Sequence, residues 1–103
     1  MKSERLDETD AAARAEALSG QGWERKEGKW LEKRYLCRTF PQAISFVVKV
    51  GEEAERRNHH PLISIDYRTV TLRLTTWSAG GLTRLDFESA EAYDQLFASP
   101  DHA

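Results

Sequence analysis

The sequence predicts an α+β domain in which three helices pack on one face of a four-stranded antiparallel sheet, in the order α-β-β-α-β-β-α. Two segments with helical character are each followed by a pair of short strand candidates, and a third helical segment follows the last strand. Stacking the helices on one face of the sheet is the simplest way to bury the apolar stripes of both. With 103 residues, the chain is expected to form one domain over residues 1–103, with a core at about 6–97 and short flexible tails.

The first third of the sequence predicts a helix followed by a β-hairpin. An alanine-rich segment at residues 7–18 is typical of a helix, and Asp7 is a suitable capping residue for it. Strand candidates follow at residues 23–26 and 30–38, and Glu27-Gly28-Lys29 between them is typical of a hairpin turn.

Residues 41–57 give the strongest helix signal. Pro41 suits a first helical turn, with Thr39 or Phe40 just before it. At about 100° per residue, the apolar stripe comprises Phe40, Ala43, Ile44, Val47, Val50, Gly51 and Ala54. The opposite, solvated face carries Gln42, Ser45, Lys49, Glu52, Glu53 and Arg56. Glu55 falls at the edge of the apolar stripe and not among the solvated glutamates.

Two further strands are predicted after this helix. His60-Pro61 is expected to end the helix, because the residue before a proline is kept out of the α region. Tyr67 is in phase with Ile63 and Ile65 on the first strand, which favours a core position for it. The second strand has one apolar face, formed by Val70, Leu72 and Leu74.

The last helix is expected to start near Thr83, after the loop Ser78-Ala79-Gly80-Gly81. Asp86 follows three residues later, in an arrangement that resembles a capping box. The helix should run to about Phe97, where Ser99-Pro100 ends it.

Charge and cysteine content exclude several classes of function. The net charge of −2 and pI near 5.9 indicate no broad basic surface, so no direct nucleic-acid binding is expected. The single cysteine, Cys37, provides neither an internal disulfide nor a thiolate framework for zinc. The first twenty residues contain no apolar segment of signal-peptide length, and the longest apolar stretch, near residues 44–50, is interrupted by Ser45 and Lys49. We therefore expect a cytoplasmic protein without a membrane partner.

The adjacent histidines His59 and His60 are the main candidates for chemistry. Histidine titrates near pH 6.5, so a close pair can supply one protonated and one neutral imidazole near neutrality. A dehydration needs both: an acid to protonate the departing hydroxyl and a base to take a proton released elsewhere. His102, the third histidine, is expected to lie in a mobile tail.

A longer spacing pattern surrounds the histidine pair. It runs from Glu55-Arg56-Arg57-Asn58-His59-His60-Pro61 through Tyr67 and Trp77 to Asp86, with Gly80-Gly81-Leu82-Thr83 between the last two. The pattern resembles the signature of the pterin-4a-carbinolamine dehydratases, a family also known for dimerisation cofactors of a homeodomain transcription factor. The resemblance covers about residues 6–97.

The resemblance implies that the chain removes water from a 4a-hydroxytetrahydropterin to give a quinonoid dihydropterin, as in tetrahydrobiopterin recycling, with no metal or organic cofactor. The catalytic positions of the family fall on Glu55, His59, His60 and Asp86. Glu55 would orient an imidazole or hold the pterin amino groups, and Asp86 could serve both the site and the helix cap. Asn58 is a further candidate for substrate contact, although a local hydrogen bond at the helix end would also explain it.

Two positions depart from the family pattern. Many members carry a third histidine where this chain has Trp77, and an indole cannot exchange protons, although it could stack on the flat pterin. The histidine pair is often followed by Pro-Glu-Trp, whereas here Pro61-Leu62-Ile63 follows, so that Ile63 would offer the pterin apolar contact alone.

Other functions remain open at the level of sequence. His59, His60 and Glu55 could form a three-ligand metal set, but adjacent histidines usually point in different directions. A non-catalytic scaffold that acts as a dimerisation cofactor, transcriptional coactivator or assembly chaperone is the main alternative, and chemistry on another pterin is a third.

The small size of the domain and the resemblance both predict a homodimer or homotetramer.

Overall fold

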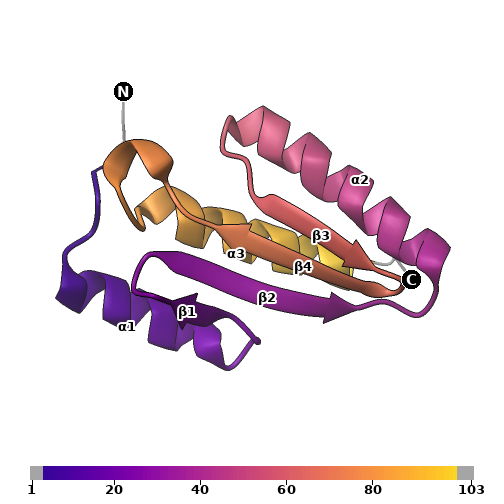
Figure 1. The fold of residues 1–103 in the computed structure, drawn as a ribbon, viewed down its shortest axis with the longest axis horizontal. Helices are drawn as coiled ribbons and strands as arrows, with labels where there is room; N and C mark the ends of the chain where they lie inside the picture. The colour runs from indigo at the N-terminus through magenta and orange to yellow at the C-terminus, as the bar shows by residue number, and fades with distance from the viewer. Residues whose placement is uncertain (1–3, 100–103) are drawn as a thin grey trace.

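The computed structural model describes residues 4–99 and has the predicted element order. The elements are α1 (Glu8–Ser19), β1 (Glu24–Lys26), β2 (Trp30–Leu36), α2 (Phe40–Arg57), β3 (Leu62–Asp66), β4 (Thr69–Leu74), a short 3₁₀ turn (Trp77–Ala79) and α3 (Arg84–Ala98). Figure 1 shows α3 running behind the central strands, with α1 and α2 toward the two edges of the sheet. The predicted α+β class is confirmed.

The four strands form one antiparallel sheet in the order β1-β2-β4-β3. Its centre is the β2–β4 pair, in which Leu31 lies opposite Leu74 and Tyr35 opposite Val70. These side chains are buried on the face that the helices cover. The other face carries Trp30, Glu32 and Arg73, and remains partly open.

The start of the first helix and the hairpin turn both follow local chemistry. Asp7 caps α1 by accepting a hydrogen bond from the Asp10 N–H, as predicted. In the turn between β1 and β2, Glu27 and Gly28 both have positive φ, the backbone that tight hairpin turns require.

A polar contact ties α3 to the sheet. The Asp94 carboxylate accepts hydrogen bonds from Trp23 Nε1 (3.0 Å), Lys33 Nζ (2.8 Å) and the Tyr35 hydroxyl (2.5 Å). Burial, and then the bond to Asp94, raise the pKa of Tyr35 far above its ordinary value. The phenol is thus a fixed donor that holds α3 in register with β2.

The buried face of α2 differs from the predicted stripe. Phe46, absent from the prediction, is fully buried together with Ala43 and Val50, whereas Phe40 and Ile44 are 45% and 40% exposed. The helix packs against α3 and the sheet along the row that includes positions 43, 46, 50 and 54, so the neighbouring row, which begins at 40 and 44, stays uncovered. Gly51 also lies on the exposed side.

The glutamates of α2 change places as a result. Glu53, expected on the solvated face, has a side chain only 13% exposed, and it forms ion pairs with Arg56 and Arg57. The hydrogen bond from Arg56 is the largest influence that lowers the pKa of Glu53. Glu55, expected at the edge of the apolar stripe, is 81% exposed.

The core position predicted for Tyr67 is wrong. Tyr67 is 70% exposed and has a φ of 54°, because the strand ends at Asp66 and the chain turns there into β4. Alternation therefore stops one residue before Tyr67. Val70, Leu72 and Leu74 of β4 are fully buried on one face, as predicted.

The last helix begins and ends as expected. Thr83 caps α3 and forms a complete capping box with Asp86, and the helix runs to Ala98 with Ser99 as its C-cap. Pro100 and His102, for which the sequence predicted a helix stop and a mobile tail, lie outside the described residues. Among residues 4–99, no helix is long and apolar enough to cross a membrane.

Candidate active site

The histidine pair emerges from the C-terminal end of α2, which closes at Asn58. Asn58 adopts the left-handed conformation (φ 53°, ψ 41°), and its N–H donates to the Glu55 carbonyl while the His59 N–H donates to the Ala54 carbonyl. These two bonds form a Schellman motif, in which asparagine is one of the few residues tolerated at the left-handed position. The helix therefore ends at Arg57, as the predicted range 41–57 has it, and the left-handed Asn58 stops it before His60-Pro61 is reached.

His59 turns inward onto the first turn of α3. Its Nε2 lies 2.6 Å from Asp86 Oδ1, and Asp86 is fully buried. The other oxygen, Asp86 Oδ2, accepts from the Thr83 N–H at 2.9 Å and from the Thr76 hydroxyl at 2.8 Å. An ionised carboxylate can only accept hydrogen bonds, so the 2.6 Å contact assigns the proton to Nε2 of His59 and leaves Nδ1 as the ring nitrogen available to a ligand.

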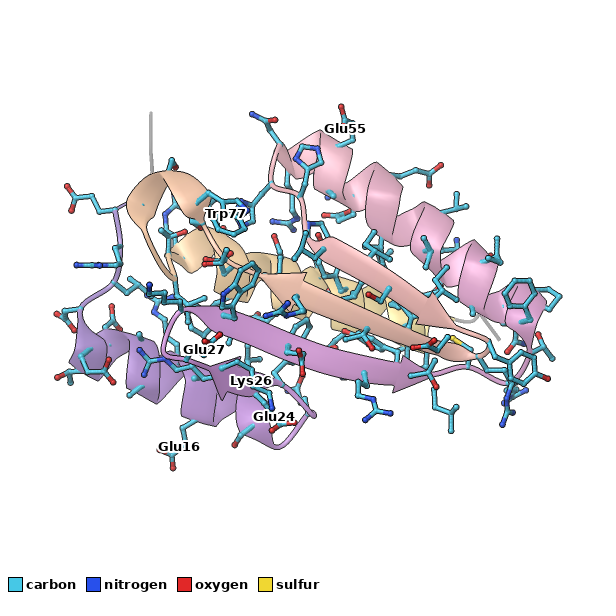
Figure 2. The ribbon with its side chains drawn as sticks, viewed as in Figure 1. Glu16, Glu24, Lys26, Glu27, Glu55 and Trp77 are labelled. Carbon is cyan, nitrogen blue, oxygen red and sulfur yellow. The ribbon has the colours of Figure 1, made fainter. Side chains whose placement is uncertain are left out.

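His60 turns the other way. Its Nε2 lies 2.8 Å from Glu55 Oε2, and the two side chains are 55% and 81% exposed. Figure 2 shows Glu55 projecting outward from the last turn of α2. The adjacent histidines are thus paired with separate carboxylates, one buried and one in solvent.

Both histidines line one open depression of about 450 Å³. Its walls are formed by the end of α2 and the segments that follow β4; the lining residues are Asn58, His59, His60, Pro61, Leu62, Thr75, Thr76, Trp77 and Ser78. Trp77 is 74% exposed on the 3₁₀ turn after β4 (Figure 2), so its indole is available to a ligand. A volume of this size is within the range of small-molecule binding sites.

The structure brings most of the predicted site residues together. His59, His60, Trp77 and Asn58 line the depression, and Asp86 lies directly beneath His59. Ile63 and Glu55 are not among the lining residues, and Glu55 is connected to the depression through its hydrogen bond with His60.

Five lining residues were absent from the predicted site; they are Pro61, Leu62, Thr75, Thr76 and Ser78, and two of them, Leu62 and Thr76, are informative. Leu62 precedes Ile63 on β3, and its side chain points to the opposite face because side chains alternate along a strand. Thr76 links the depression to Asp86 through its hydroxyl. The adjacent polar residues Thr75-Thr76, at the end of an apolar strand, were the available signal for the second of these.

Comparison with known sequences places this chain in one family. Residues 4–96 match the family described as "Pterin 4 alpha carbinolamine dehydratase". A relative from Picosynechococcus sp. is 42% identical over 88 residues, which cover 85% of this chain and 95% of the relative. One from Sulfurisphaera tokodaii is 41% identical over 88 residues, covering 85% and 94%. Both relatives bear the name "Putative pterin-4-alpha-carbinolamine dehydratase".

Solved structures agree with the sequence comparison. The transcriptional coactivator/pterin dehydratase from Brucella melitensis superposes with a TM-score of 0.83 at 28% identity, covering 90% of this chain and 98% of that one. A pterin dehydratase-like protein identified as a RuBisCO assembly factor in the alpha-carboxysome has the same fold, with a TM-score of 0.64 at 21% identity over 76% and 92% of the two chains. By its sequence and its fold, the chain belongs to the pterin-4-alpha-carbinolamine dehydratase family.

Proposed function

We propose that this chain is a 4a-hydroxytetrahydropterin dehydratase that works in tetrahydrobiopterin recycling. The observation that carries the proposal is that His59 and His60 line one depression while each is hydrogen-bonded to its own carboxylate. Such pairing fixes the ring orientation of an imidazole and determines which of its two nitrogens is left to face a ligand.

The reaction breaks the bond between C4a and its hydroxyl group and removes the proton from N5. One imidazole donates a proton to the departing hydroxyl, which leaves as water, and the other accepts the N5 proton, so that a C4a=N5 double bond forms. In each turnover the acid imidazole loses a proton and the base imidazole gains one. Proton exchange with solvent at the exposed His60 restores the starting state.

Trp77 supports the binding of a flat substrate. Its exposed indole at the rim of the depression offers an aromatic face for a pterin ring. Asn58, Leu62 and Thr75 provide polar and apolar contacts along the same wall. Ile63 lies next to this wall in sequence, and its expected contact with the pterin stays a prediction.

The decisive experiment measures loss of the 4a-hydroxyl from a freshly generated 4a-hydroxytetrahydropterin by absorbance. Wild-type protein should accelerate the loss, and His59→Ala and His60→Ala should each lower kcat by about 10²–10⁴-fold. His102→Ala, which alters the remaining histidine of the sequence, is the matched control and should retain the rate.

A wild-type rate equal to the uncatalysed one would remove the enzymatic proposal. The scaffold function would then take its place, since a structural relative is named as a coactivator as well as a dehydratase. A scaffold could use the buried His59–Asp86 pair for stability, but it has no chemical need for the exposed His60–Glu55 pair beside it, and this is why we place the enzyme first.

We also propose that the chain forms a homodimer or homotetramer. Large apolar side chains are exposed along α2 and the β3 edge of the sheet; they are Phe40, Ile44, Val48, Leu62, Ile63 and Tyr67. Exposed apolar side chains gathered on neighbouring elements are typical of protein interfaces. A monomeric mass by light scattering at micromolar concentration would contradict this. A cytoplasmic location stays a prediction from the sequence.

A further inference from the structure

Trp77 is poorly fixed by its own surroundings. It is 74% exposed, and it stands on the three-residue turn Trp77–Ala79, which Gly80 closes in a left-handed conformation. An exposed side chain on such a turn samples several rotamers unless a neighbour selects one. A substrate contact at Trp77 therefore needs a second residue that holds the indole.

Trp30 is that neighbour. The ring centroids of Trp30 and Trp77 are 5.1 Å apart and their planes cross at 82°, which is the edge-to-face arrangement that aromatic rings prefer. In an edge-to-face pair, at least one face of Trp77 stays uncovered by Trp30. Trp30 is the first residue of β2 and is half-buried on the face of the sheet opposite to the helices.

Trp30 is itself held by the sheet. The Arg73 guanidinium carbon lies 4.5 Å from the centroid of the Trp30 ring, within the range of a cation–π contact. Arg73 lies directly opposite Glu32 in the β2–β4 register, and its Nε is 3.3 Å from Glu32 Oε1. The ion pair keeps the guanidinium close to β2, where it lies against the indole of Trp30.

The contact between the two indoles adjoins the depression. A cleft of about 110 Å³ lies beside them, lined by Lys29, Trp30, Thr75, Trp77, Gly80 and Gly81. It shares Thr75 and Trp77 with the depression that His59 and His60 line. Trp77 thus borders two hollows, one lined also by the histidines and the other lined also by Trp30.

We propose that Trp30, fixed by Arg73, is a positioning residue that holds the Trp77 indole at one angle, so that it presents a face to a pterin over the histidines. This inference rests on the proposed function, because it assumes that a pterin occupies the depression. Trp30 itself need not touch the substrate.

The first test compares Trp30→Ala with Trp30→Phe. The alanine variant frees Trp77, so the KM for the 4a-hydroxytetrahydropterin should rise about fivefold while kcat stays within about twofold. Phenylalanine keeps a ring edge at the same place and should restore KM to within about twofold of wild type. Equilibrium dialysis with a stable 7,8-dihydropterin should give the same order of affinities without any turnover.

The second test observes the contact itself. Two indoles at this distance and angle should give an exciton couplet in the circular dichroism spectrum, and Trp30→Ala and Trp77→Ala should abolish the same couplet. Arg73→Ala should weaken the couplet and raise KM by about twofold, because one support of Trp30 is lost. Arg34→Ala, on the same open face of the sheet, is the matched control and should change neither. Thermal unfolding of each variant checks that the fold is retained.

Three outcomes overturn the inference. The first is a wild-type spectrum without the couplet, since the indoles then do not meet in solution. The second is an active wild type in which Trp30→Ala loses the couplet but keeps its KM and its pterin affinity. The third is a wild type that neither binds nor converts a pterin, which removes the proposed function as well. If the couplet is still present, the two indoles do meet, and it is the proposed function that has failed. Should Trp30→Ala fail to fold, the Trp30→Phe and Arg73→Ala variants decide the matter by the same measurements.

Discussion

The two histidine–carboxylate pairs have almost the same geometry and very different surroundings. The nitrogen–oxygen distance is 2.6 Å for His59 and Asp86, and 2.8 Å for His60 and Glu55. The first pair has side chains 10% and 0% exposed, whereas the second has 55% and 81%. An ion pair in solvent contributes about 0–1 kcal/mol, but removing one partner of a buried pair costs about 3–5 kcal/mol. Distance alone therefore says little about what each pair contributes to stability.

The largest difference should appear when the carboxylates are removed. Asp86→Ala takes away the partner of His59, the acceptor for Thr76 and half of the α3 capping box. We expect the free energy of unfolding in urea to fall by about 3–5 kcal/mol. Glu55→Ala is the matched control, and its change should stay below about 1 kcal/mol. Equal losses in the two variants would show that the buried pair has no special role in stability.

The histidines should differ in the same sense, by a smaller amount. His59→Ala leaves the buried Asp86 carboxylate without one hydrogen-bond donor, and we expect a loss of about 1–3 kcal/mol by urea unfolding. His60→Ala leaves no buried group without a hydrogen-bond partner, because Glu55 lies in solvent. Its free energy of unfolding should lie within about 0.5 kcal/mol of wild type. If the proposed function holds, both variants lose activity, so stability and activity separate only at His60.

The left-handed turn at Asn58 sets the direction of both histidines. Asn58→Ala places a side chain that cannot form a local hydrogen bond at a φ of 53°. We expect the free energy of unfolding to fall by about 1 kcal/mol. Asn58→Gly should be at least as stable as wild type, because glycine adopts this conformation freely. A glycine variant with normal stability but lowered pterin affinity would identify a substrate contact for the Asn58 side chain.

The smallest effect is expected from a third imidazole. Trp77→His places an exposed histidine at the rim of the depression, in surroundings closer to those of His60 than of His59. If proton transfer limits the rate, kcat should rise about threefold, which corresponds to about 0.6 kcal/mol. A fall in activity with a raised KM would show instead that stacking by the indole matters more.

Most of the fold could be predicted because local signals and core burial agree. The caps at Asp7 and Thr83 and the burial of the β4 face follow from residue type and spacing alone, whereas the sequence left Thr39 and Phe40 both open at the start of α2. The prediction of the buried face of α2 was wrong because that face depends on which other elements pack against the helix. The amphipathic pattern of α2 admits several apolar rows, and the positions of α3 and the sheet determine that Phe46 is covered and Ile44 is not.

The site was predictable in part for a similar reason. The histidine pair and Asp86 are visible as a spacing, but the sequence does not tell that His59 faces inward and His60 outward. That division depends on the Schellman motif at Asn58, which turns the chain by a left-handed residue before the expected stop at proline. The contact of Trp30 with Trp77 joins residues 47 positions apart, beyond the reach of any local pattern.

The double use of Asp86 links the site to the folding of α3. The carboxylate that orients His59 is also the one that closes the first turn of the helix, so fraying of that turn releases the imidazole. Site assembly and helix initiation are then one cooperative unit in local unfolding. Amide hydrogen exchange in the first turn of α3 should therefore slow when a pterin binds at the histidines. A ligand that holds His59 in place also favours its contact with Asp86, and so favours the closed turn.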